Sequence, residues 1–249
     1  MMRTANPALN DATFSGLGRA AASEEPMTIQ GTVNKTIFLL VLLLFSATWT
    51  WSLYYSQNTQ ALTLWLLVGA VGGFIVALIT IFKKAWSPVL APFYAVLEGL
   101  MLGGISSIFE ARYPGIVIQA VGLTFGTLFG LLLAYKSRLI RATENFKLGV
   151  VAATGGIALF YLITMVLGFL GIRIPYIHEG GLIGIGFSLF VVVVAALNLV
   201  LDFDFIEQGA VRGAPKYMEW YGAFGLMVTL IWLYLEILRL LSKIRSRRD

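Results

Sequence analysis

The stretch TIFLLVLLLFSATWTWSLYY, residues 36–55, decides the fold class. It is apolar over about the 20 residues that a helix needs to cross the hydrocarbon core of a bilayer. It ends in tryptophan and tyrosine, which favour the membrane–water interface. Similar runs follow at 61–82, 88–110, 114–135, 147–171, 180–201 and 218–241. Strands of a β-barrel would alternate over about 10 residues, so these continuous runs predict an all-α polytopic membrane protein with seven transmembrane helices.

The composition also indicates that lipid is part of the solvent. Of 249 residues, 58% are hydrophobic and 12% are charged, whereas about 25% are charged in a typical soluble domain. The absence of cysteine excludes disulfides and thiolate metal sites, and the single histidine, His178, argues against a multi-histidine metal centre. Phosphate-binding, dinucleotide-binding and hydrolase motifs are missing as well. We therefore expect no cofactor, no firm metal site, no nucleic-acid partner and no enzymatic activity.

The chain divides into a polar tail over 1–35, a seven-helix domain over 36–241 and a basic tail over 242–249. Lys and Arg concentrate in cytoplasmic loops of membrane proteins, and this rule places the N-terminus in the cytoplasm. The loops that would then face inward carry Arg3, Arg19, Lys35, Lys83, Lys84, Lys136, Arg138, Arg141, Lys147, Arg212 and Lys216. The outer loops carry only Arg112 and Arg173. The basic tail breaks this rule, so the last span either crosses despite the penalty or is re-entrant.

Acidic residues within membrane spans are costly and usually face a cavity or a partner. Glu98 lies near the middle of the third span. It either serves a proton or ion path, or has a structural role as a carboxyl group that is hydrogen-bonded to a neighbouring helix or held neutral by desolvation. Asn198 and Asp202 are four residues apart and share a helical face, which extends the polar surface of Asp202 into the sixth span. Asp204 lies off that face, and ordinary interfacial charge is its simpler interpretation. A calcium ion in transit is expected to bind at Asp202.

The seventh span carries two further acids. Glu219 lies at its start, and Glu236 lies near its end, three residues before Arg239. That spacing allows Glu236 and Arg239 to form an ion pair on one face of a helix.

Glycines recur every four residues in two of the spans. Gly122, Gly126 and Gly130 do so in the fourth span, and Gly99 and Gly103 in the third. Such spacing predicts faces where helix backbones approach closely.

The chain resembles the Bax inhibitor-1 family in its bacterial YccA-like branch. The resemblance covers essentially the whole chain. It is carried by the segments MMRTANPALND, MTIQGTVNKT, YAVLEGLMLGGIS, LDFDFIEQGA and EWYGAFGLMVTLIWLYLEILRLL, in that order.

The resemblance implies a seven-helix fold whose last helix is central, and a pH-sensitive calcium leak latched by two aspartates that share a proton. Asp202 matches the first aspartate, and the second is expected near Thr229. Glu236, two turns further along, and Glu219 are the candidate substitutes. The second span lacks the acid that some relatives carry, and Glu98 is the candidate to replace it.

The sequence therefore leaves two functions open. The first is a bacterial inner-membrane leak channel or exchanger for calcium or protons, gated by protonation of carboxylates that include Asp202. The second is a non-transporting regulator that binds another membrane protein, such as a protease, through the polar tail.

Overall fold

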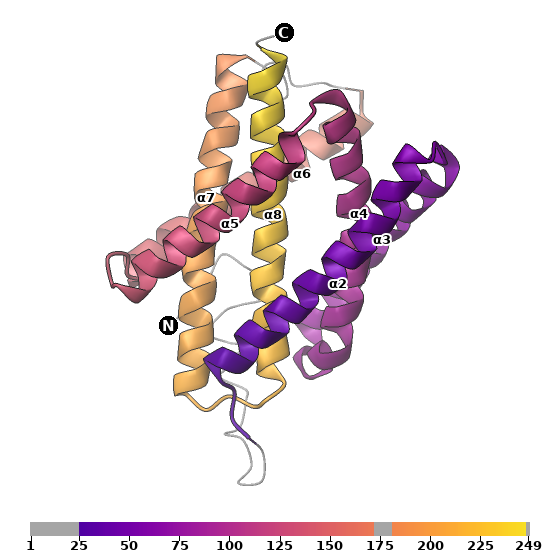
Figure 1. Cartoon of the computed structure of the whole chain (residues 1–249). Helices are drawn as coiled ribbons and strands as arrows, with labels where there is room; N and C mark the ends of the chain where they lie inside the picture. The colour runs from indigo at the N-terminus through magenta and orange to yellow at the C-terminus, as the bar shows by residue number, and fades with distance from the viewer. Residues whose placement is uncertain (1–24, 172–180, 248–249) are drawn as a thin grey trace. The chain divides into compact units, whose positions relative to one another are not determined.

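The computed structural model describes residues 25–171 and 181–247, and these residues form seven long helices and one short 3-10 turn (Figure 1). All seven long helices are long and apolar enough to cross a membrane, which confirms the predicted all-α, seven-span fold. They are α2 (Ile29–Tyr55), α3 (Thr59–Phe82), α4 (Ser87–Arg112), α5 (Ile116–Lys136), α6 (Glu144–Phe169), α7 (Leu182–Val211) and α8 (Met218–Ser246), with η1 (Lys84–Trp86) before α4.

The helices at the two ends of the chain extend beyond the predicted apolar runs. Thr28 caps α2 by accepting a hydrogen bond from the Gly31 amide, so the helix begins at Ile29 and includes part of the predicted tail. At the other end α8 continues to Ser246 through residues assigned to the basic tail. Because α8 is one unbroken helix of 29 residues, about 43 Å long, a full crossing fits it better than a re-entrant path.

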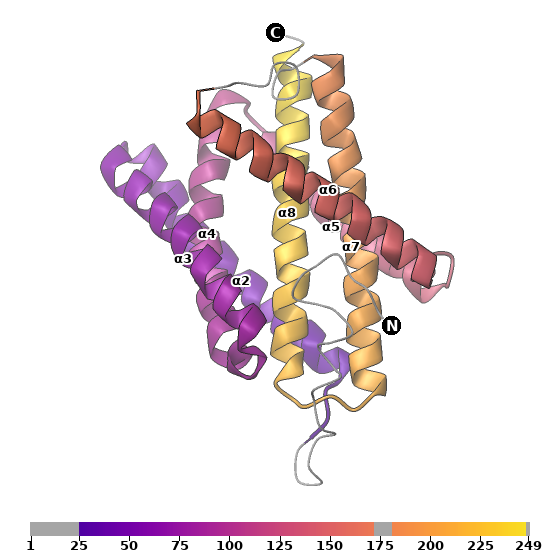
Figure 2. The same cartoon turned by 180° about the vertical axis from the view of Figure 1, so that it is seen from behind.

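The chain folds into two compact units. The amino-terminal unit comprises Ala12–Pro114 and Phe205–Val228, and the carboxy-terminal unit comprises Gly115–Asp204 and Thr229–Asp249. In the amino-terminal unit α2, α3 and α4 lie side by side, as both views show (Figures 1 and 2). In the carboxy-terminal unit α7 and α8 run next to each other in both views.

Close backbone contacts hold α4 in the amino-terminal unit. A Cβ atom added at Gly99 would collide with Ser46 and Leu43 of α2, and one added at Gly103 would collide with Ala47. The predicted close approach of helices at these two glycines is therefore confirmed.

The glycines of α5 behave differently. Among the described residues, no heavy atom lies within 4 Å of a Cβ atom added at Gly122, Gly126 or Gly130. The predicted helix contact at this stripe is wrong, because spacing places the glycines on one face but does not supply a neighbour for that face.

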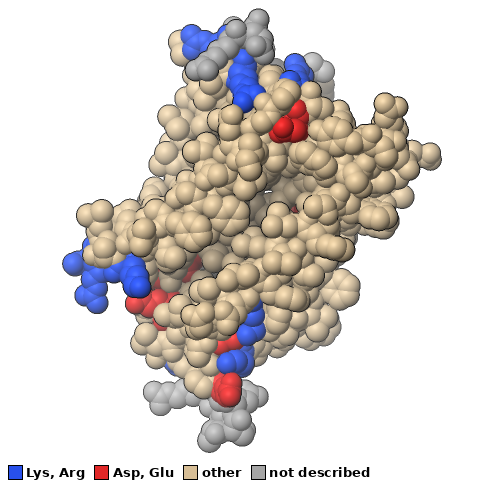
Figure 3. All heavy atoms as spheres, viewed as in Figure 1, with Lys and Arg blue, Asp and Glu red and all other residues tan. Residues whose placement is uncertain are grey.

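The last helix is the most buried of the seven. In its most apolar stretch 61% of the residues are buried, the highest share among the spans. It supplies Tyr221, Phe224 and Met227 to the interior of the amino-terminal unit and Leu233 and Leu238 to that of the carboxy-terminal unit. Many large hydrophobic side chains are exposed, and on the face shown in Figure 3 the charged side chains gather in a few small clusters. Such a surface suits contact with lipid.

Candidate functional site

Polar side chains from α6, α7 and α8 form the candidate site in the carboxy-terminal unit. Asp202 on α7 is fully buried, with 0% of its surface exposed, and Asn198 one turn earlier is 2% exposed. The Asn198 side-chain amide donates to Thr154 Oγ1 on α6 at 2.9 Å and to the Val194 carbonyl at 2.8 Å. A polar face therefore extends from Asp202 into the span, as its sequence predicted.

A buried lysine fixes the register of α8 against α7. Lys243 Nζ donates to Ser188 Oγ at 2.8 Å and to the Gly184 carbonyl at 3.1 Å. Asp202 follows Ser188 by fourteen residues, and Thr229 precedes Lys243 by fourteen on the antiparallel neighbour. Fourteen residues of helix rise by about 21 Å. Asp202 and Thr229 therefore lie at the same level, and Thr229 is itself buried.

The same register places Glu236 two helical turns, about 10 Å, from the level of Asp202. Its carboxylate instead accepts hydrogen bonds from Arg239 at 2.8 Å and from the Tyr161 hydroxyl of α6 at 3.1 Å. Arg239 also donates to the Tyr161 oxygen at 2.8 Å. The predicted Glu236–Arg239 ion pair is therefore present, but a proton shared between Glu236 and Asp202 does not fit this geometry.

Asp204 belongs to an ion pair at the end of α6. The Lys147 ammonium lies 2.9 Å from its carboxylate, and the Tyr135 hydroxyl donates to it at 3.4 Å. Lys147 also lies 3.5 Å from Glu144, one turn earlier on its own helix. Because Lys147 is buried, Asp204 compensates a charge that would otherwise be costly. Asp204 therefore lies in an ion pair with a buried cation, and its interpretation as ordinary interfacial charge stays a prediction.

Glu219 lies in the amino-terminal unit and binds the start of α2. Its carboxylate accepts hydrogen bonds from the amide and the hydroxyl of Thr28, at 2.9 and 2.8 Å. It also forms ion pairs with Lys35 and with Lys216, the latter at 3.3 Å. These donors occupy the carboxylate, so its geometry is that of a structural link between α2 and α8. A role as the proton-sharing partner of Asp202 has no support here.

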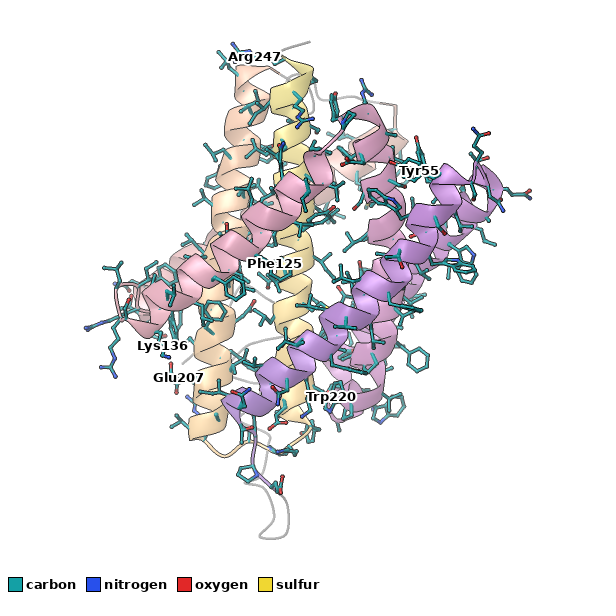
Figure 4. The ribbon with its side chains drawn as sticks, in the orientation of Figure 1. Tyr55, Phe125, Lys136, Glu207, Trp220 and Arg247 are labelled. Atoms are coloured by element: carbon teal, nitrogen blue, oxygen red, sulfur yellow. The ribbon has the colours of Figure 1, made fainter. Side chains whose placement is uncertain are left out.

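The local sequence explains why this contact forms. A Cβ atom added at Gly31 would collide with the Glu219 carboxylate, so a residue without a side chain is needed there. Glu219 also lies in the first turn of α8, where the helix dipole favours negative charge. The Lys35 ammonium lies 5.4 Å from the ring centroid of Trp220, which Figure 4 labels beside α2. We call Thr28, Lys35, Lys216 and Glu219 the α2–α8 clasp.

Glu98, the remaining predicted acid, lies deep in α4. It is 8% exposed and packs against Gly73 of α3. It belongs to the amino-terminal unit, whereas Asp202 belongs to the carboxy-terminal unit.

Sequence reasoning missed several partners, because it treated their charges only as topology signals. Lys147 lies in the first turn of α6, where a positive charge opposes the helix dipole. That unfavourable position is a signal that an acidic partner exists. Lys243 follows Arg239 by four residues, so the two cations share a face that extends the polar face of Glu236.

The described residues contain no group of three or more His, Cys, Asp or Glu side chains that could hold a metal ion. His178 lies outside the described residues. The chain matches the family described as Bax inhibitor 1 like over residues 6–246. It belongs to this family. No curated protein and no solved structure matches the chain.

Membership of the Bax inhibitor 1 like family bears on the register between α7 and α8. The bacterial YccA-like branch is consistent with the match. The level of α8 at which the resemblance places a second aspartate carries Thr229, and the two glutamates of α8 are bound to cations. In this Bax inhibitor 1 like protein, the buried acid at that level of the carboxy-terminal unit, among the residues described, is Asp202.

Proposed function

We propose that this membrane protein is a pH-sensitive leak channel or exchanger for cations, with calcium as the transported ion, in which protonation of Asp202 gates conduction. Membership of the Bax inhibitor 1 like family supports the proposal. In this proposal the protein lies in a bacterial inner membrane with a cytoplasmic N-terminus, and it is not an enzyme.

The observation that carries the proposal is the complete burial of Asp202 within a column of polar side chains. Measured along α7, the column begins with Asp202 and passes the Asn198–Thr154 bond one turn earlier on the same face. It continues through the Glu236–Arg239–Tyr161 group to Lys243 and Ser188. Successive levels are separated by no more than about four residues, or 6 Å of helix. Such spacing is short enough for water or a cation to move from one polar group to the next.

Desolvation explains why protonation would act as the gate. An ionised carboxylate inside a membrane costs several kcal/mol unless water or a cation reaches it. Loss of the Asp202 proton therefore favours a hydrated or cation-filled column, and its return favours a dry one. A single buried carboxylate is sufficient for this coupling.

The experiment uses the whole protein in liposomes that contain a calcium-sensitive dye. Flux is measured between about pH 5 and 8, the range in which buried carboxyl groups with shifted pKa values titrate. We expect flux that changes with pH in the wild type and flux that is independent of pH in Asp202→Asn. Glu144→Gln is the matched control, because the Glu144 side chain is 63% exposed and lies outside the column.

Two results would overturn the proposal. One is the absence of calcium flux at every pH in that range. The other is a pH profile in Asp202→Asn that coincides with the wild-type profile.

The alternative is a non-transporting regulator that binds a second membrane protein. The segment just before α2 contacts the α7–α8 loop, because the Met27 amide donates a hydrogen bond to the Ala214 carbonyl at 2.7 Å. A partner that bound the tail would therefore act on the start of α8. Co-purification with and without residues 1–24 tests this idea, and equal recovery of every partner in both cases would rule it out.

A further inference from the structure

Glu98 lies far from both ends of its helix. It is eleven residues after Ser87 and fourteen before Arg112, where α4 begins and ends. These separations correspond to about 16 and 21 Å of helix. Since the hydrocarbon core of a bilayer is about 30 Å thick, the carboxyl group of Glu98 lies near its middle.

A glycine surface of α3 covers this carboxyl group. A Cβ atom added at Gly73 would lie 2.7 Å from Glu98 Oε1. One turn away, a Cβ atom at Gly69 would lie 2.7 Å from the Met101 amide nitrogen. The α3 helix therefore packs closely against α4 at Glu98 and at Met101, and this close packing excludes water from that face of Glu98.

Tyr94, on the same helix, also covers the Glu98 carboxyl group. It lies one turn before Glu98, forms a side-chain hydrogen bond with it, and packs its ring edge-on against Phe224 of α8 at 4.9 Å. Among the described residues, none forms a hydrogen bond with the second oxygen, Oε2. One half of the carboxyl group is thus buried without a polar contact.

Charged groups on the elements packed around Glu98 are engaged elsewhere. The α3 helix has no charged residue, and Lys35, the only charged residue of α2, pairs with Glu219 of α8. In η1, Lys84 lies over the ring of Tyr221. The remaining charges of α4 itself, Glu110 and Arg112, lie three or more turns away. No ion pair within the described residues involves Glu98.

We propose that Glu98 is a proton-binding site of the amino-terminal unit, separate from Asp202, and that it holds its proton at neutral pH. An ionised carboxylate at this depth would cost several kcal/mol, and no described cation offsets that cost. The neutral acid satisfies the site better, because its oxygens need fewer donors. Gly73 and Gly69 contribute by allowing the α3 backbone to exclude water.

Carbodiimide labelling tests the site without any measurement of transport. The lipid-soluble reagent dicyclohexylcarbodiimide reacts with a protonated carboxyl group. The acid proton moves to a carbodiimide nitrogen, and the carboxyl oxygen bonds to the central carbon. The adduct then rearranges to a stable N-acylurea that retains every atom of the reagent. Peptide mass spectrometry identifies the labelled residue.

We expect an adduct at Glu98 when the protein in liposomes is treated at pH 7, and labelling that declines as the pH rises toward about 9. Glu144, whose side chain is 63% exposed, is the control and should remain unlabelled. Glu98→Gln removes the adduct, whereas Asp202→Asn leaves it in place. This last variant separates the two proposals, because labelling does not require calcium flux.

If the reagent does not reach Glu98, infrared spectroscopy provides an independent test of its protonation. A protonated carboxyl group has a carbonyl band that an ionised carboxylate lacks. We expect that band at pH 7 in the wild type and its loss in Glu98→Gln, whose amide side chain has nearly the same shape. Identical spectra of the two proteins in this region, together with no adduct at Glu98, would overturn the proposal.

Discussion

The α2–α8 clasp makes the sharpest prediction about stability. Glu219 is fully buried, and the Lys35 side chain that pairs with it is 19% exposed. Removing one partner of a buried ion pair typically costs 3–5 kcal/mol, because the other charge remains buried without compensation. We expect Glu219→Gln to lower the free energy of unfolding by about 3 kcal/mol, since its amide oxygen can still accept a hydrogen bond from Thr28. Lys35→Met should cost about 2 kcal/mol, because Thr28 continues to stabilise the carboxylate.

The double variant should cost less than the sum of the two single changes. Once Lys35 is gone, replacing Glu219 no longer leaves an ammonium group without its carboxylate. We expect a coupling free energy of about 2 kcal/mol from the double-mutant cycle. The assay is reversible unfolding of the purified protein in mixed micelles, supported by thermal melts. A loss of about 3 kcal/mol corresponds to a decrease in Tm of roughly 6–12 °C for a domain of 150–250 residues.

Lys216 supplies the matched control for this cycle. Hydrogen bonds from Lys216 to Glu25 and Glu219 raise its pKa above the ordinary value, but its ammonium is exposed to solvent. A raised lysine pKa stabilises the folded state below the unfolded-state pKa, and this contribution is lost as the pH rises through the folded-state pKa. Lys216→Met should therefore change stability much less than Lys35→Met across the neutral range. A coupling below about 0.5 kcal/mol between Glu219 and Lys35 would refute the clasp.

Two further predictions concern packing and gating. Gly99→Val should lower the Tm, because its side chain collides with Ser46 and Leu43. Gly126→Val should leave the Tm unchanged, because no described atom lies close to that position. Equal Tm values for the two variants would contradict the packing argument. Thr229→Asp should move the pH midpoint of calcium flux upward, because two carboxylates at one level resist joint ionisation, and Thr229→Asn should leave it in place. An unchanged midpoint in Thr229→Asp would mean that the register of α7 and α8 is wrong.

Hydropathy predicted the number and type of the helices but missed where the outer ones begin and end. The α2 helix starts with Ile29 and includes Gln30, Asn34 and Lys35, which no hydropathy argument assigns to a span. The Thr28 cap and the contact with Glu219 stabilise this polar first turn. At the other end, the hydrogen bonds of Lys243 to α7 place a charged residue inside a helix. Both extensions depend on partners that are distant in sequence.

The residues of the candidate site and the pairs within one helix were predictable, but the partners on other helices were not. Spacing within one helix identified the Glu236–Arg239 pair and the shared face of Asn198 and Asp202. It could not identify Tyr161, Thr154 or Lys147 as partners, because those contacts depend on how α6 packs against α7 and α8. The glycines also show that spacing within one helix does not identify its neighbours. Gly99 and Gly122 lie in similar patterns, yet only Gly99 faces a neighbouring helix.

The acids predicted as site residues differ in their surroundings. Glu219, Glu236 and Asp204 each lie within an ion pair, with Lys35, Arg239 and Lys147 respectively. The neighbouring cation compensates the charge of each of these carboxylates, so they serve mainly as structural contacts. Asp202 and Glu98 are buried at 0% and 8% exposure, inside a polar column and against a glycine surface. An ionised carboxylate inside a membrane span is costly unless water or a cation reaches it, so the entry of water would matter most at these two positions. The pH response of calcium flux should therefore depend on Asp202, and it should survive neutralisation of any one of the paired acids.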